Sequence, residues 1–377
     1  MDTQRLSAQL NLEPKPWLQR QVTAEQLSES LTGRHAREHW KYSPIGAFVD
    51  AYVAHQGQAR VADTVELHGT HQSGVSVTAL ADLPAAALVR VQEAITRVDP
   101  QRYPLAEITA LNVATGHLIN ISESLAQPIR IRHLGGVALV LIEVAENASA
   151  PIIETSDEPH FGNTLTLLNL GAGARLSHAR SALTAAPMHW SLLSVQVAAN
   201  ASYDLTQYLV GGQKRRSDCH IALTGPGANA TVTGAFVTED GHHLDQQLVV
   251  EHRAPRTTSA QTIHGIGMGK SRSIFNGRIH IHPGASGADA QLRNKNLSLN
   301  PGADIHTKPE LEIYTDDVKC AHGATVGQLD LEQLFYLRSR GVPEAQARSL
   351  LCSAFVRSCI TGPLAEPATQ RLTECLA

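Results

Sequence analysis

The stretch NASYDLTQYLVGGQKRRSDCHIALTGPGANA, residues 200–230, decides the fold of this chain. Its segment 203–210 alternates apolar and polar residues, which predicts a strand with one buried face. The pair Asn200-Ala201 precedes this segment, and a similar pair, Asn229-Ala230, follows 29 residues later. Asparagine tolerates the left-handed backbone of a corner, and a small alanine lets one coil stack closely on the next. A corner repeated at this spacing is typical of a stacked solenoid.

Similar small pairs and short apolar segments continue on both sides of this stretch. The further pairs are Asn147-Ala148, Gly173-Ala174, Gly284-Ala285, Gly302-Ala303 and Gly323-Ala324. The further strand-like segments are 137–144, 165–170, 192–197, 231–237, 248–250 and 278–281. No amphipathic helix separates them, so a βαβ sheet is excluded, and a β-helix is predicted over 117–327. A β-sandwich is the alternative, although it favours more aromatic residues than the 4% of this chain.

The regions that flank the predicted β-helix have helical signals. Residues 1–116 are expected to be mixed and largely helical, with a capping box at Thr23 and Gln26 and a helical run over 105–114. Residues 328–377 are expected to form a small helical domain, in which Asp330 caps the first helix and Gly341 ends it. The chain is therefore predicted to be mainly β, with a helical region at each end.

Composition excludes several classes of protein. The net charge is −4, and the one short basic run is Lys214-Arg215-Arg216, which is interpreted as a solvated loop. Nucleic-acid binding is therefore not expected. No run of eighteen apolar residues is present, so no membrane span is expected. The five cysteines are scattered and form no CxxC motif, which predicts free thiols and a cytoplasmic location.

The densest chemistry lies in HTKPELEIYTDDVKCAHGATVGQLDLEQLFYLRSRG, residues 306–341. In an extended segment Cys320 and His322 share one face, and thiolate and imidazole suit iron or zinc. Lys319 is expected to favour the thiolate. A buried structural cysteine beside a turn histidine is the alternative. One cysteine and one histidine do not complete a cluster site, so further ligands would come from another chain.

Other candidate sites are weaker. His280 and His282 share one face of an expected strand, but no third ligand stands at a fixed spacing, so exposed histidines are the favoured interpretation. The segment 265–271 is similar to a phosphate loop, yet His264 occupies the position of its first glycine. No Gly-x-Ser-x-Gly or His-Glu-x-x-His motif is present, and no catalytic residue is predicted.

Three segments together carry a resemblance to a known family. They are 308–341, with its D-D-V-K-C-x-H-G-A-T-V-G core, the run FNGRIHIHPGA at 275–285 continuing to 296–299, and EHWKY at 38–42. They resemble the SufB/SufD family of iron–sulfur cluster assembly proteins. The Cys-rich motif expected near the N-terminus of the SufB branch is absent, which favours the other branch.

The resemblance implies a right-handed parallel β-helix and a non-catalytic scaffold. It implies pairing with a SufB-like subunit, binding of a SufC-like ATPase through the C-terminal helices, and no permanently bound cofactor. Cys320 and His322 map onto the Cys-x-His motif of the family, as ligands for transient iron or a cluster shared with SufB. The residues expected to bind partners are Asp330, Leu331, Leu334, Phe335, Arg338 and Arg340. A β-helix polysaccharide lyase or hydrolase and a self-sufficient structural homodimer are the alternatives.

Overall fold

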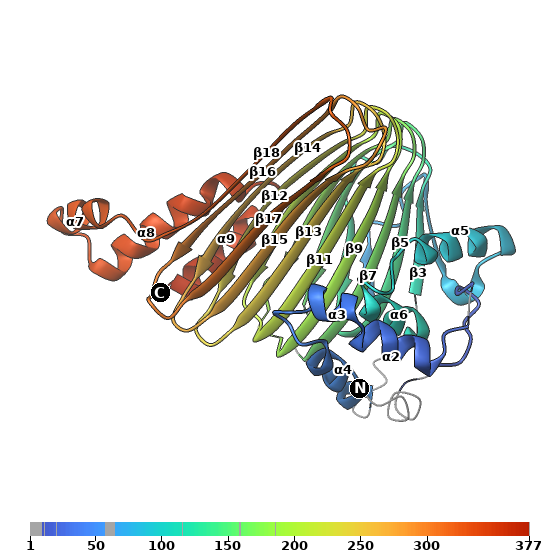
Figure 1. The fold of residues 1–377 in the computed structure, drawn as a ribbon, viewed down its shortest axis with the longest axis horizontal. Helices are drawn as coiled ribbons and strands as arrows, with labels where there is room; N and C mark the ends of the chain where they lie inside the picture. Colours follow the sequence, from blue (N-terminus) through green and yellow to red (C-terminus); the bar gives the residue numbers. More distant parts are fainter. Residues whose placement is uncertain are drawn as a thin grey trace.

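The computed structural model describes residues 10, 12–19, 21–56, 65–114, 116–157, 160–184 and 186–376. Two long sheets face each other along a slanted stack of coils, with N-terminal helices near the start of the stack and C-terminal helices near its end (Figure 1).

Over the described residues, each of the two sheets contains nine strands. We call sheet A the strands β1 (Val65–His68), β4 (Ile129–His133), β6 (Ser149–Ser156), β8 (Arg175–Ala182), β10 (Ser202–Val210), β12 (Asn229–Thr238), β14 (Thr258–Gly267), β16 (Ala288–Ser298) and β18 (Val318–Gly327). We call sheet B the strands β2 (Val75–Ala79), β3 (Gly116–Ile121), β5 (Gly136–Val144), β7 (Phe161–Leu170), β9 (Met188–Val197), β11 (Lys214–Leu223), β13 (His243–His252), β15 (Arg272–Ile281) and β17 (Asp304–Ile313).

The strands from β3 onward form a parallel β-solenoid of about eight turns, because each turn gives one strand to each sheet. Lys214 pairs in parallel with Met188 and with His243, so successive turns differ in length by a few residues. Strands β1 and β2 pair antiparallel with β4 and β3 and cover the edges of the first turn. The predicted mainly β fold is confirmed and the β-sandwich is excluded. The right-handed sense implied by the resemblance stays a prediction.

One column of left-handed residues turns the chain at the same corner of successive coils. Its members are Asn147, Gly173, Asn200, Gly227, Arg256 and Gly287, with φ between 54° and 72°. The backbone amide of each donates to a carbonyl of the following coil, as Asn200 does to Pro226 at 3.0 Å. A Cβ on Gly227 would lie 2.5 Å from Asn200 Oδ1, so glycine is required there.

Two predicted corners are wrong. Asn229 begins β12 two residues after the real corner at Gly227, and Gly323 lies inside β18. Asparagine and glycine occur at corners and within strands alike, so residue type alone does not place the turn.

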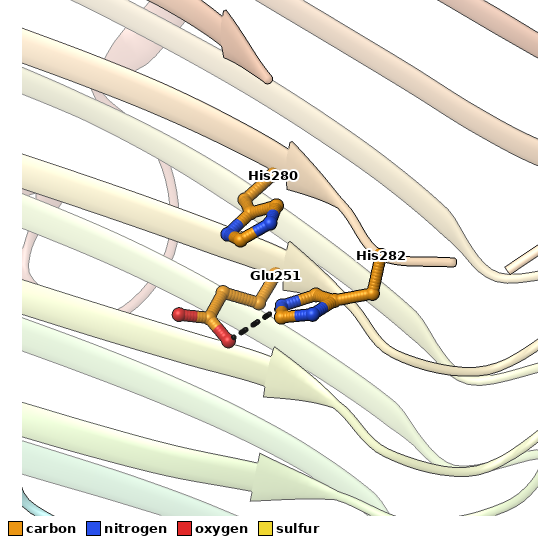
Figure 2. A group of neighbouring side chains, drawn as sticks. All are labelled: Glu251, His280 and His282. Carbon is orange, nitrogen blue, oxygen red and sulfur yellow. Dashed lines mark hydrogen bonds and ion pairs between the residues drawn. The ribbon is translucent and has the colours of Figure 1, made fainter. Parts of the chain in front are cut away.

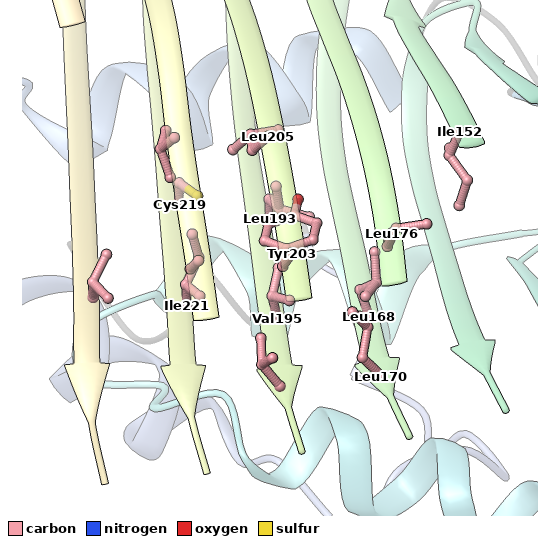
Figure 3. Close-up of a cluster of buried hydrophobic side chains, with 14 of the residues drawn as sticks. Ile152, Leu168, Leu170, Leu176, Leu193, Val195, Tyr203, Leu205, Cys219 and Ile221 are labelled. Carbon is pink, nitrogen blue, oxygen red and sulfur yellow. The ribbon is translucent and has the colours of Figure 1, made fainter. Parts of the chain in front are cut away.

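The space between the two sheets is filled mainly by aliphatic side chains. Figure 3 shows Leu193, Val195 and Ile221 of sheet B packed with Tyr203 and Leu205 of sheet A. All five are at most 1% exposed. Burying an aliphatic side chain of this size contributes roughly 1.5–3 kcal/mol, so repeated coils build a continuous core without many aromatic residues.

The N-terminal helices cover the outer face of the first strands of sheet B. They are α2 (Ala24–Thr32), α3 (Arg34–His39), α4 (Ile45–Gln56), α5 (Ala85–Thr96) and α6 (Pro104–Asn112). Their core cluster includes Phe48 and Leu111 and continues into Leu165 and Trp190 of the sheet. The predicted capping box at Thr23 is confirmed, as is the helical run that forms α6.

The C-terminal helices α8 (Glu344–Val356) and α9 (Ala365–Leu376) cover the outer face of sheet A. Val356 and Leu372 belong to one buried cluster with Tyr208, Val237 and Ile266 of the sheet. Helix α7 (Leu331–Ser339) instead projects away from the solenoid (Figure 1). In the part of the chain that the structure describes, no helix is both long and apolar enough to cross a membrane.

The basic run lies in a strand and its two arginines are buried, which corrects its interpretation as a solvated loop. Arg215 and Arg216 lie in β11 and are 0% and 2% exposed. Arg216 Nη2 donates to Asp218 Oδ1 at 2.9 Å, and its Nη1 donates to Asp245 Oδ2 at 2.8 Å. Its guanidinium also stacks 3.9 Å from the ring centre of Trp40. Two carboxylates therefore neutralise a charge that joins the N-terminal region to sheet B.

Candidate functional site

The last coil leaves one edge of each sheet unpaired. Within the described residues, β17 pairs only with β15 and β18 only with β16, and each of these two last strands has ten residues. Unlike the first coil, the last coil has no antiparallel strand along its edges in the part of the chain that the structure describes. A long open edge presents a row of free backbone donors and acceptors, which is a template for pairing with another chain. We call these two strands the open end.

Apolar side chains accompany the open end. Ile313 at the end of β17 is 42% exposed, Tyr314 is 60% exposed and Val326 of β18 is 48% exposed. In the preceding coil the register partner of Ile313 is Ile281, which β17 covers and which is 0% exposed. Exposed apolar groups beside unpaired backbone are typical of a surface that another protein covers.

Cys320 and His322 lie on β18, on the same inward-facing row. Their register partners on β16, Ala290 and Leu292, are both buried in the core between the sheets. Cys320 is half-buried and packs against that core. His322 is exposed, because among the described strands none pairs with the other edge of β18. The predicted shared face is therefore confirmed.

The expectation that Lys319 favours the Cys320 thiolate is wrong in direction. Burial raises the pKa of the Cys320 thiol, and the nearby Asp289 carboxylate raises it further. Partial desolvation and the neighbouring negative charge both disfavour the thiolate. Among the described residues, three metal-binding side chains come together only at Glu251, His280 and His282, which are not on β18. Cys320 and His322 by themselves offer at most two ligands.

Helix α7 is held at both ends by local contacts. The Asp330 carboxylate accepts hydrogen bonds from the backbone amides of Glu332 and Gln333 at 2.9 and 3.1 Å, as predicted for the N-cap. Gly341 adopts φ +87° directly after the helix, as expected for its C-terminal stop. Arg338 pairs with Glu344 of α8 at 3.3 Å.

The apolar residues of α7 divide between two faces. Leu334 is 6% exposed and so supports the helix from inside the chain. Leu331, Phe335 and Tyr336 are 74%, 72% and 57% exposed, and Arg340 lies over the ring of Tyr336. Of the residues predicted to bind partners, Leu331 and Phe335 are thus the ones that present large apolar surface to solvent.

The structure also places the phosphate-loop-like segment 265–271 and the histidine pair His280 and His282. Gly265 and Gly267 end β14, and a turn with no following helix leads to β15, which agrees with rejecting a phosphate loop. The histidine pair was wrongly interpreted as exposed, because the side chains of His280 and His282 are 17% and 31% exposed. Glu251, one coil earlier, stands beside them. Only the coil length could have linked these positions.

The fold and its last coil define a parallel β-solenoid protein with two unpaired sheet edges. The family model described as "SUF system FeS cluster assembly, SufBD core domain" matches residues 131–355. The chain therefore belongs to the SufBD family of iron–sulfur cluster assembly proteins.

Curated relatives align with most or with part of the chain. The iron–sulfur cluster assembly protein SufD of Escherichia coli is 29% identical, over 89% of this chain and 86% of its own length. A SufBD family protein of Mycobacterium leprae is 36% identical over 43% of this chain and 44% of its own length. The chloroplastic protein ABCI7 of Arabidopsis thaliana is 29% identical over 57% of this chain and 47% of its own length. Family membership supports a role in iron–sulfur cluster assembly.

Proposed function

We propose that this chain is a non-catalytic scaffold subunit of a SufBCD-type complex. It pairs with a SufB-like subunit at the open end and binds a SufC-like ATPase through α7. The observation that carries the proposal is the pair of unpaired ten-residue edges, β17 and β18. The five free cysteines suit the reducing cytoplasm, where we place the complex.

Pairing at the open end would extend both sheets at once. A partner with the same architecture offers two strands that satisfy the free backbone groups of β17 and β18, which is strand augmentation. The same contact would bury Ile313, Tyr314 and Val326. Pairing by backbone hydrogen bonds supplies affinity, and these side chains supply specificity.

Docking through α7 follows from its exposed apolar face. The helix contacts the rest of the chain mainly through α8, so Leu331 and Phe335 contribute little to the solenoid. Helices with an exposed apolar stripe commonly bind in grooves of a partner. An ATPase bound here would contact α7, which continues along the chain into α8 and α9 on sheet A, so movements of the ATPase can reach the open end.

Iron or a nascent cluster is the cargo in this proposal. His322 with Cys320 would supply part of its ligands from the inward row of β18. A cluster commonly takes four protein ligands, so the SufB-like partner would supply the others. The raised pKa of Cys320 means that loading also removes a proton from this thiol.

The docking part is tested by pull-down with a SufC-like ATPase. We expect Leu331→Ser/Phe335→Ser to lose ATPase binding, while Val89→Ser keeps it. Val89 is a matched control because it is 48% exposed on the distant helix α5. Point substitutions test docking more specifically than truncation after Gly327, because truncation would also remove α8 and α9 and expose the outer face of sheet A. Unchanged binding by the double variant would disprove the docking assignment.

The pairing and cargo parts need the co-expressed complex. Ile313→Lys/Val326→Lys should prevent assembly with the SufB-like subunit, because edge charges oppose strand pairing. His322→Ala should leave assembly intact and lower the iron and sulfide content of the complex. Normal iron and sulfide in the His322 variant would refute its ligand role. A mass equal to two copies of this chain, with no SufB-like subunit, would favour the homodimer.

A further inference from the structure

Three metal-binding side chains from two successive coils meet on the outer face of sheet B (Figure 2). Glu251 lies on β13, its register partner His280 lies on β15, and His282 follows the last residue of β15. Val250 and Ile279 belong to the core, so Glu251 and His280 point outward. One ligand atom from each of the three lies within 4.8 Å of the others.

The three side chains are held in place by packing. The rings of His280 and His282 stack with centres 3.8 Å apart, and Tyr314 lies 5.4 Å from His280. His282 Nε2 is 3.1 Å from Glu251 Oε2. The side chain of Glu251 is 12% exposed, so its rotamers are restricted. Such preorganisation lowers the entropy that an ion must overcome on binding.

The carboxylate of Glu251 already has two orienting partners. His220 Nε2 lies 3.0 Å from Oε1, and Arg253 Nη2 lies 2.6 Å from Oε2. Hydrogen bonds of this kind commonly fix the ligands of metal sites from the second shell of side chains. A second carboxylate, Glu312, lies 3.8 Å from His280 Nδ1 on the opposite side.

We propose that Glu251, His280 and His282 form a binding site for a divalent transition ion of the Zn²⁺ or Fe²⁺ type. Two imidazole nitrogens and one carboxylate oxygen are a ligand set that both ions use, and the remaining positions take water. Metal–ligand bonds of about 2.1 Å place ligand atoms roughly 3.4 Å apart. The ligand atoms, which lie within 4.8 Å of one another, therefore need to approach by at most roughly 1.4 Å. The ion replaces the contact between His282 and Glu251.

This site lies apart from Cys320 and His322, and it does not depend on the proposed function. Cys320 and His322 face inward on sheet A, whereas Glu251, His280 and His282 face outward on sheet B. The two sites are therefore tested by different variants of the same chain.

The test is metal binding by the full, chelator-treated chain without partners. Co²⁺, Zn²⁺ and anaerobic Fe²⁺ are titrated by calorimetry, with visible absorption of Co²⁺ as a ligand-field signature. We expect about one ion per chain at this site, and His280→Ala/His282→Ala should weaken affinity by far more than tenfold. Cys320→Ala/His322→Ala is the matched control and should leave this binding unchanged.

Two further variants keep the test decisive if the double variant folds poorly. His282→Gln changes only the turn after β15, and Glu251→Gln preserves shape while removing charge; each should weaken binding by about tenfold or more. Circular dichroism confirms the fold of each. The proposal is overturned if these folded variants bind as tightly as the wild type, or if only the Cys320→Ala/His322→Ala variant loses the ion.

Discussion

Replacing Arg216 with alanine distinguishes the buried network from the solvated loop that the basic run suggests. Arg216 is 2% exposed and lies between Asp218 and Asp245, each 1% exposed. The variant leaves both carboxylates buried without their shared cation and removes the stacking on Trp40. Breaking a buried ion pair by removing one partner costs about 3–5 kcal/mol, so we expect the free energy of unfolding to fall by that amount. Substitution of a residue in a solvated loop would change the free energy of unfolding by at most about 0.5 kcal/mol.

The measurement is guanidinium unfolding followed by circular dichroism at pH 7, with Lys214→Ala as the control from the same basic run. Lys214 is only partly buried, and we expect its loss to stay below about 1 kcal/mol. Burial raises the pKa of Asp218, so acidification should neutralise this carboxyl and shrink the loss in the Arg216 variant. The loss of unfolding free energy in Arg216→Lys should lie between those of Arg216→Ala and Lys214→Ala, because lysine lacks the forked guanidinium that reaches two carboxylates. Equal stabilities of Arg216→Ala and Lys214→Ala would refute the reasoning.

Two further predictions concern acid stability and the corner column. Burial lowers the pKa of His252 from 6.5 to about 4. Between these two pH values the imidazole binds a proton only in the unfolded chain. The free energy of unfolding should therefore fall by up to about 3 kcal/mol as the pH drops through this range. His252→Asn should reduce the pH dependence of the unfolding midpoint, whereas His71→Asn, at an exposed position, should not. The same pH dependence in both variants would contradict this prediction. Gly227→Ala forces a Cβ against Asn200 Oδ1 at φ +71° and should cost roughly 1–3 kcal/mol in denaturant unfolding. Gly323→Ala, with open space around it, should stay within about 0.5 kcal/mol, and an equal loss at both glycines would disprove the steric argument.

The sequence predicted the repeated architecture because the repeat is local. Each corner needs a residue that tolerates positive φ, and each strand needs alternation, so Asn200 and the segment that follows it carry their own signals. Helix signals are equally local, as the caps at Thr23 and Asp330 show. Exact corners were less certain, since Asn229 fits a strand as well as a turn.

The candidate site was predictable only in part. Cys320 and His322 stand two residues apart, so a shared face follows from the period of a strand. Their surroundings do not follow from spacing, because the half-burial that raises the pKa of Cys320 depends on the coil beneath it. The exposure of Leu331 and the burial of Leu334 likewise depend on how α7 meets α8.

By itself, the sequence determined a β-solenoid with a helical region at each end and a family motif on its last strand. The tertiary structure alone decided which residues from different coils meet. Arg216 with Asp245, and Glu251 with His280, are each 29 residues apart and become neighbours through strand register. Coil length varies along the chain, so this register is set by the packing of every coil on the previous one. The burial of charge and the gathering of metal-binding side chains both follow from that packing.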